Sequence, residues 1–226
     1  MPVPRRPFLA FPRAVAAAAV LLAGFASAAS AGEAGWMLSL SAGGALNIPT
    51  HLAIEQRGEP DIRLTASYDT RALEPPIYYS LRLGRVDPAG AWEIELIHQK
   101  IRLRDPPPEV QRFEISHGYN LLLFGRSWDR RAAVLRAGAG PVISHPETTV
   151  RGRNIAHGEG ILGKGYYLSG FGVQLAAEKR SRPAAGFALS IEGKLTTAWA
   201  RVPVADGHAD APNVALHALV GLARAF

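Results

Sequence analysis

The last fourteen residues place apolar side chains on nearly every second position, and such alternation is the pattern of a β-strand. The apolar positions in this segment are Val214, Leu216, Ala218, Val220, Leu222 and Phe226. From residue 35 onward the hydrophobic period stays at two residues, and no segment keeps a helical stripe over a dozen residues. The chain is therefore predicted to be all β.

Eight segments reach the roughly 9 to 11 residues that a tilted membrane strand needs. They are residues 35–45, 77–86, 91–103, 111–125, 132–144, 165–178, 186–201 and 213–226. Short connections alternate with longer ones between them, as expected when both termini lie on one side of a membrane. We predict an eight-stranded antiparallel transmembrane up-and-down β-barrel with short periplasmic turns and longer extracellular loops.

Two further segments leave the strand count open between eight and ten. Leu52–Gln56 and Ile62–Tyr68 also alternate, and they flank a turn-like stretch from Arg57 to Pro60. Because Leu52–Gln56 is too short to cross a bilayer, we favour a hairpin above the membrane over a ten-stranded barrel.

The start of the chain has the organisation of a secretory signal peptide. Arg5, Arg6 and Arg13 precede or open an apolar stretch over residues 14–25, and small-residue A-x-A steps follow. A retained membrane anchor is the alternative, but this apolar core is short for a span of roughly 20 residues. We predict that residues 1–31 are cleaved on export and that residues 32–226 form one barrel domain in the bacterial outer membrane.

The composition of the predicted mature chain excludes several classes of function. Removal of residues 1–31 leaves 22 basic and 19 acidic residues, a net charge of +3. No basic run with interleaved aromatic residues is present, so nucleic acid is not an expected partner. The absence of cysteine excludes disulfides and thiolate metal sites.

Charged residues share one face of several predicted strands, and apolar residues share the other. We expect the charged face to be the barrel interior, because a charge at the bilayer midplane costs about 2 to 4 kcal/mol. In residues 111–125 this rule directs Arg112, Glu114, Ser116 and Asn120 inward, and Phe113, Ile115, Tyr119, Leu121 and Leu123 outward.

The charged face supplies cations and anions in nearly equal number. An eight-stranded barrel is just wide enough for side chains to fill, so these groups are predicted to form a buried ion network in a plugged lumen, and a general porin is not expected. The predicted network consists of Arg82, Glu93, Glu95, Glu114, Arg136, Glu192, Lys194 and His217.

Residues 113–120 contain Ser116 and His117, a pair that suggests a hydrolase. Adjacent residues of a strand point to opposite faces, so these two cannot act as nucleophile and base unless a bulge intervenes. We therefore predict no catalytic residue here.

A basic patch is predicted on the outward face near the outer leaflet. Folding residues 91–103 against 111–125 places His98 opposite His117, with Lys100 and Arg102 on the same face. Cationic groups bind the phosphates of lipopolysaccharide, so we predict a lipid A contact, with a solvated strand extension as the alternative.

The stretch from Ser144 to Lys164 contains His145, Glu147, His157 and Glu159, all of which are residue types that bind divalent cations. Their spacing matches no recognised metal motif, and glycines recur through the segment. We expect a flexible exposed loop here, without a metal or any other cofactor.

With its strand pattern and terminal Phe226, the mature chain resembles the small outer-membrane β-barrel superfamily that includes OmpA-, OmpX- and OmpW-like proteins. The resemblance implies that the outer-membrane assembly machinery recognises Phe226. Residues 113–120, 136–140 and 145–147 look like the pattern of barrels grouped near bacterial lipid A oxidase, but no catalytic residue of that enzyme matches a position here. The His-x-Ser pattern of the lipid A 3-O-deacylase barrels is absent.

These observations lead us to expect a non-catalytic outer-membrane barrel that serves envelope structure or surface interaction. Its expected partners are outer-membrane lipids, lipopolysaccharide and the assembly machinery. Two alternatives stay open: an enzyme that modifies lipid A, and a narrow channel for small hydrophobic molecules. The enzyme requires convergent titratable groups at the outer leaflet, and the channel requires a continuous void.

Overall fold

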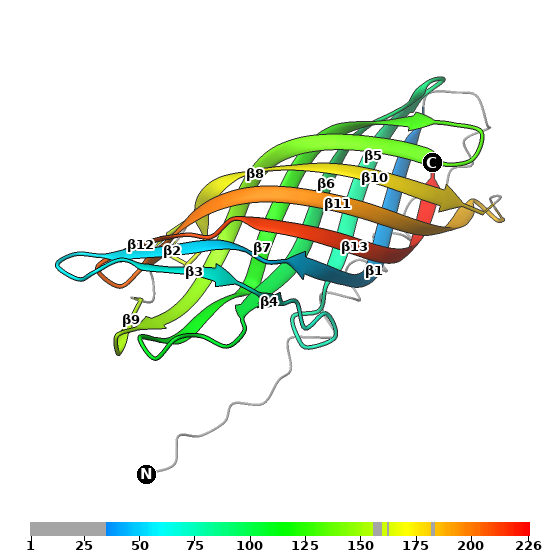
Figure 1. Cartoon of the computed structure of the whole chain (residues 1–226). Helices are drawn as coiled ribbons and strands as arrows, with labels where there is room; N and C mark the ends of the chain where they lie inside the picture. Colours follow the sequence, from blue (N-terminus) through cyan, green and yellow to red (C-terminus); the bar gives the residue numbers. More distant parts are fainter. Residues whose placement is uncertain (1–34, 156–159, 162, 182–183) are drawn as a thin grey trace, which may run out of the picture.

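The protein folds into a closed antiparallel β-barrel (Figure 1). This computed structural model describes residues 35–155, 160–161, 163–181 and 184–226, so the predicted signal peptide lies outside the described residues. Among these residues, no helix is long and apolar enough to cross a membrane. The prediction of an all-β chain is confirmed.

Eight strands form a hydrogen-bonded ring, and each overlaps one of the eight predicted segments. In ring order they are β1 (Trp36–Ile48), β5 (Tyr79–Asp87), β6 (Gly90–Leu103), β7 (Val110–Asp129), β8 (Val134–Val150), β10 (Tyr167–Arg180), β11 (Phe187–Val204) and β13 (Asn213–Ala225). The first and last strands, β1 and β13, close the ring by pairing antiparallel over twelve residue pairs. At the start of β1, the Trp36 amide donates to the Phe226 carbonyl at 2.8 Å, and the Phe226 amide donates to the Trp36 carbonyl at 2.9 Å.

One end of the barrel carries short turns, whereas the other end carries longer connections with additional short strands (Figure 1). The turn end carries the connections that follow β5, β7 and β10, together with the C-terminus. The extended end carries five short strands: β2 (Thr50–Gln56), β3 (Ile62–Ala66), β4 (Tyr68–Asp69), β9 (Arg153–Asn154) and β12 (Gly207–Asp210). The predicted hairpin is present as β2 and β3, and β12 joins it to β11, so this hairpin extends the barrel wall and adds no strand to the ring.

Strands β7 and β8 continue beyond their predicted ends and pair as far as Val110 opposite Val150. His145 and Glu147 therefore lie on β8, and their expected place in a flexible loop was wrong. The strand continues through Pro146, which pairs with Ile115 next to an irregularity in the pairing of β7 with β8, a place where proline is tolerated in a sheet. His157 and Glu159 lie outside the described residues.

The interior has two layers. The layer near the turn end is charged, whereas the layer near the extended end is apolar. The apolar layer includes Leu52, Ile54, Ile97, Ile101, Phe113, Ile115, Tyr119, Leu121, Leu123, Val142 and Val202, all of which are buried. The predicted facing of β7 was therefore wrong: Leu121 and Leu123 point inward, while Leu122 and Phe124 are exposed. The rule that charge faces the interior fails where the interior is itself apolar.

The outward face of the ring carries a belt of large exposed apolar side chains. Seven of the eight ring strands contribute to it through Leu83, Ile94, Phe124, Leu135, Phe171, Leu175, Leu189, Ile191, Leu216 and Val220. Large contiguous apolar surface is rare on soluble monomers. The outside of the barrel is therefore suited to contact lipid.

Candidate functional site

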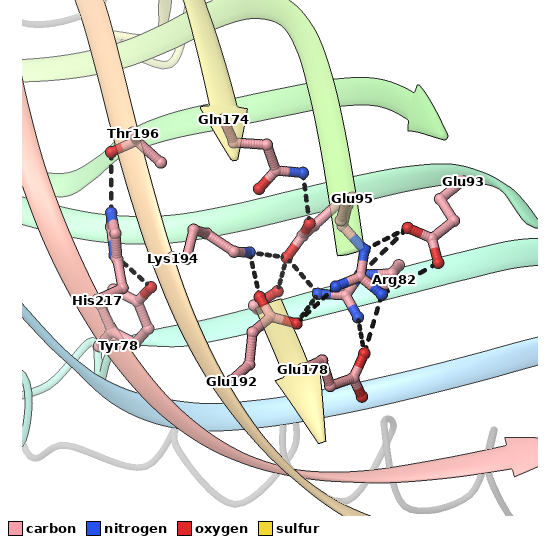
Figure 2. A network of polar contacts seen from close by, with 12 residues as sticks. Tyr78, Arg82, Glu93, Glu95, Gln174, Glu178, Glu192, Lys194, Thr196 and His217 are labelled. Atoms are coloured by element: carbon pink, nitrogen blue, oxygen red, sulfur yellow. Dashed lines mark hydrogen bonds and ion pairs between the residues drawn. The ribbon is translucent and has the colours of Figure 1, made fainter. Parts of the chain in front are cut away.

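A cluster of seven charged side chains fills the interior layer near the turn end. Each member points inward because it shares the inward parity of its strand, and each is at most 5% exposed. This ionic cluster consists of Arg82 on β5, Glu93 and Glu95 on β6, Arg136 on β8, Glu178 on β10, and Glu192 and Lys194 on β11. Figure 2 labels all of its members except Arg136.

Glu192 is the shared acceptor at the centre of the ionic cluster. Its Oε2 accepts from Arg82 at 2.6 Å and from Arg136 at 2.8 Å, and its Oε1 lies 3.0 Å from the Lys194 ammonium. Because one carboxylate contacts three cations, its removal would leave all three short of a partner.

The remaining acids complete the pairing of the two arginines. Arg136 binds Glu93 and lies 2.9 Å from Glu178, while Arg82 lies 3.1 Å from Glu95 and 3.4 Å from Glu178. Four acids thus face three buried cations. Arg180 supplies a fourth cation at the rim, 2.8 Å from Glu178, so that charges of the two signs balance.

Neutral side chains surround the ionic cluster and take up its free acceptor positions (Figure 2). Gln174 donates to Glu95 at 2.8 Å, and Ser80 also donates to Glu95. His217 forms no ion pair with the cluster; it bonds the Tyr78 hydroxyl at 2.7 Å and the Thr196 hydroxyl at 2.8 Å. His217 therefore belongs to the layer between the charged and apolar parts of the interior.

The sequence identified six of the seven members of the ionic cluster and added two residues, Glu114 and His217, that lie elsewhere. It missed Glu178, which stands at the very end of the predicted segment 165–178, although Glu178 and Gln174 have the same parity. Glu114 points outward and pairs with the exposed side chains of Arg102 and Arg112, so its predicted place in the lumen was wrong. The reversed facing of β7 is the physical reason.

The predicted lipid A contact residues share the outward face but do not form one patch. His98 stacks on Tyr79 with ring centroids 5.0 Å apart and bonds Asn120 at 2.7 Å, so its predicted position opposite His117 was wrong. Lys100 is nearly buried and donates to the Glu74 carbonyl at 2.7 Å. Only Arg102 and His117 of the four keep large exposed surfaces.

His117 differs from the other three residues because it lies in a bulge of β7. Ile115 pairs with Pro146 and Tyr119 pairs with Ser144, so three residues of β7 stand where β8 has one. Gly118 adopts a positive φ of 119°, a conformation that side-chain-bearing residues rarely adopt. The bulge brings Ser116 and His117 to the same side, within 3.0 Å of each other and in contact with Glu147.

The chain matches no protein-family model and no curated protein. Among solved structures, it is similar to the outer membrane protein AlkL, determined by solid-state NMR in DMPC bilayers, at 11% identity and a TM-score of 0.50. This match covers 89% of this chain and 94% of that chain. It also matches Ail, the attachment invasion locus protein of Yersinia pestis, at 11% identity and a TM-score of 0.34, over 84% of this chain and 99% of that chain. At such identities the similarity to AlkL concerns the fold alone. The fold of this chain is thus the one found in the small outer-membrane β-barrels.

Proposed function

We propose that this protein is a non-catalytic barrel of the bacterial outer membrane with a closed lumen, and that it serves envelope structure or surface interaction. The observation that carries the proposal is that side chains bridge the barrel across its full width. Arg82 on β5 contacts Glu178 on β10 at 3.4 Å, although β5 and β10 lie four strands apart in either direction around the ring. Lys194 on β11 likewise contacts Glu95 on the opposite strand β6.

The apolar layer contains a third bridge, closer to the extended end. The Tyr119 hydroxyl on β7 donates to the Ala211 carbonyl at 3.1 Å, just before the opposite strand β13. Bridges at two levels, with apolar packing between the walls, count against a continuous water path. They also count against the alternative of a narrow channel through the barrel.

Arginine–aromatic pairs support a membrane position for the apolar belt. Near the turn end, Arg guanidinium groups lie over Trp36, Trp92 and Phe187 at 5.4, 5.2 and 5.0 Å from the ring centroids. Toward the extended end, Arg201 lies 5.7 Å from the ring centroid of Trp199. Aromatic rings next to charged groups at two levels fit the two girdles of an outer-membrane barrel.

The closed lumen is tested by electrical recording from the purified protein in planar bilayers, with a general porin as the positive control. We expect no stepwise conductance from the folded protein, whose folding is checked by its shifted mobility on unheated gels. Stepwise currents from the folded barrel would reject the closed lumen.

The proposal includes the outer-membrane assembly machinery as a partner that recognises the C-terminal aromatic residue. Replacing Phe226→Ala keeps the backbone bonds to Trp36, so refolding in detergent should be nearly unchanged. We expect much less assembled barrel in the outer membrane of cells. Equal amounts of the assembled wild type and variant would contradict this partner.

Lipopolysaccharide is the proposed partner of the outward basic groups near the extended end. Arg102 and Arg112 are about half exposed and both lie beside Glu114, and guanidinium groups are strong binders of phosphate. Vesicles that contain lipid A should bind the barrel more weakly after a double Arg102→Ala and Arg112→Ala change. Binding that is equal to that of the unchanged protein would remove lipopolysaccharide from the proposal.

A lipid A-modifying enzyme is the second candidate, favoured by one observation: the β7 bulge places Ser116 and His117 next to Glu147. The hydrogen bonds do not form a relay, because Ser116 and Glu147 both contact Nδ1 of His117, whereas a catalytic triad uses both ring nitrogens. Mass spectrometry of lipid A from cells with and without the protein tests this candidate. A mass shift that disappears in a Ser116→Ala variant would establish an enzyme and overturn the proposal of a non-catalytic barrel.

A further inference from the structure

Three side chains that commonly bind metal ions converge on the outer surface where β7 bulges. They are His117 from the bulge and His145 and Glu147 from β8, and one ligand atom of each lies within 4.8 Å of the other two. His117 Nδ1 and Glu147 Oε1 are 3.0 Å apart, and the rings of His117 and His145 have centroids 4.9 Å apart. A tetrahedral ion with bonds of about 2.0 to 2.2 Å holds its ligand atoms about 3.3 to 3.6 Å apart, and small side-chain rotations would bring the three ligand atoms to such separations.

The alternation of β8 explains why His145 and Glu147 share a face. They are two residues apart on one strand, so both point outward from the barrel. His117 reaches the same place because the bulge re-aims its side chain, and bulges often have this role beside functional sites. A regular strand in place of the bulge would direct His117 away from His145 and Glu147 and break the cluster.

Neighbouring groups already orient two of the three ligands. Arg112 binds Oε2 of Glu147, which leaves Oε1 directed toward His117. The His145 ring packs edge-on against Tyr166 at 4.8 Å, and a Cβ at Gly165 would come within 2.9 Å of the ring. Outer partners of this kind fix ligand orientation in metal sites, and their loss typically weakens affinity by 10-fold to 100-fold.

We propose that His117, His145 and Glu147 bind one divalent transition metal ion of the zinc type. Imidazole nitrogen and carboxylate oxygen are the ligands that zinc accepts, and two His with one Glu is a set that leaves a fourth position open. The side chain of His117 is 54% exposed, so that open position faces the outer surface of the barrel, next to the Ser116 hydroxyl. The site is independent of the closed lumen, because all of its ligands lie outside the barrel wall.

The metal itself is the probe. Tag-free barrel in detergent is loaded with Zn²⁺ and desalted, and its zinc content is measured by elemental mass spectrometry. Isothermal titration calorimetry measures the affinity. We expect one equivalent of zinc in the wild type and loss of this equivalent in His117→Ala and Glu147→Gln. X-ray absorption at the zinc edge should show imidazole nitrogen and carboxylate oxygen as ligands.

The chain offers a matched control in a second His–Glu contact, between His208 and Glu55, whose closest atoms are 3.3 Å apart. Among the described residues this pair does not belong to a cluster of three ligand residues, so His208→Ala should keep the zinc equivalent. Arg112→Ala keeps all three ligands and should bind zinc about 10-fold more weakly. Retained stoichiometric zinc in folded His117→Ala, or its loss in folded His208→Ala, would overturn the proposed site.

Discussion

The two interior layers both fill the inside of the barrel with side chains, but one layer is charged and the other is apolar. Near the turn end, charged side chains meet across the barrel in the ionic cluster, whereas near the extended end leucine, isoleucine and aromatic side chains pack against one another. The side chains of both layers are buried. The difference lies in what happens when one member is removed, because an apolar side chain leaves a cavity whereas a charged side chain leaves its partners charged and buried.

The largest expected effect comes from the centre of the ionic cluster. Glu192→Ala removes the shared acceptor of two arginines and a lysine, so we expect the free energy of unfolding to fall by about 3 to 5 kcal/mol. The measurement is denaturant unfolding in detergent followed by tryptophan fluorescence.

Glu114→Ala is the matched control, because it removes the same side chain from the outward face. Its arginine partners are about half exposed, so the loss should be at most about 1 kcal/mol. Equal unfolding of the Glu192 and Glu114 variants would show that the interior pairs are screened by water, against the closed lumen.

The next effect belongs to the apolar layer. Leu121→Ala should lower the free energy of unfolding by about 2 to 5 kcal/mol, because Leu121 is fully buried and its loss leaves a cavity. Leu122→Ala, one residue further on the exposed face, should cost less because detergent replaces the lost contacts. A larger loss of unfolding free energy for the Leu122 variant than for the Leu121 variant would indicate that Leu121 points outward, as the sequence predicted.

The period of two residues was sufficient to predict the ring of eight strands. It also located six members of the ionic cluster, because charges such as Arg82, Glu95 and Lys194 are tolerated in a membrane strand only when they face inward. The same rule failed on β7. There the strand rises into a layer whose interior is apolar and whose exterior is polar, and period alone does not tell which face is which.

The cluster of Ser116, His117 and Glu147 on the outer surface could not be predicted from the sequence, because it depends on how β7 pairs with β8. Ser116 and His117 are neighbours, and an ideal strand separates their side chains; only an irregular pairing with β8 brings them together. Gly118 is the one local signal, since a bulge often needs a residue free to adopt positive φ. The recurring glycines of residues 144–164 suggested a loop, so His145 and Glu147 were not expected on a strand.

A smaller effect is expected where the apolar layer contains polar groups. Asn213 accepts from Gln99 at 2.8 Å and donates to Asn47 at 2.8 Å, linking β6, β13 and β1 through a short chain of amides. Asn213→Ala leaves a buried donor and an acceptor without this partner, so we expect a loss of about 1 to 3 kcal/mol. The same unfolding assay measures it, and a loss as large as that of Glu192→Ala would mean that the apolar layer depends on its polar links.

The smallest effect tests a charge pair of the extended end against the ionic cluster. Arg201 binds Asp210 through two bonds of 2.8 Å, and this hydrogen-bonded guanidinium holds the pKa of the Asp210 carboxyl below its ordinary value. A lowered pKa in the folded state means that the contribution to stability is present above the unfolded pKa and is lost as pH falls through the folded pKa. Because Arg201 is half exposed, the loss should not exceed about 1 kcal/mol. Carboxyl carbon NMR over an acid titration should show the low Asp210 pKa and its return toward the ordinary value in Arg201→Ala, and an identical titration in both proteins would mean that the bidentate pair does not persist in solution.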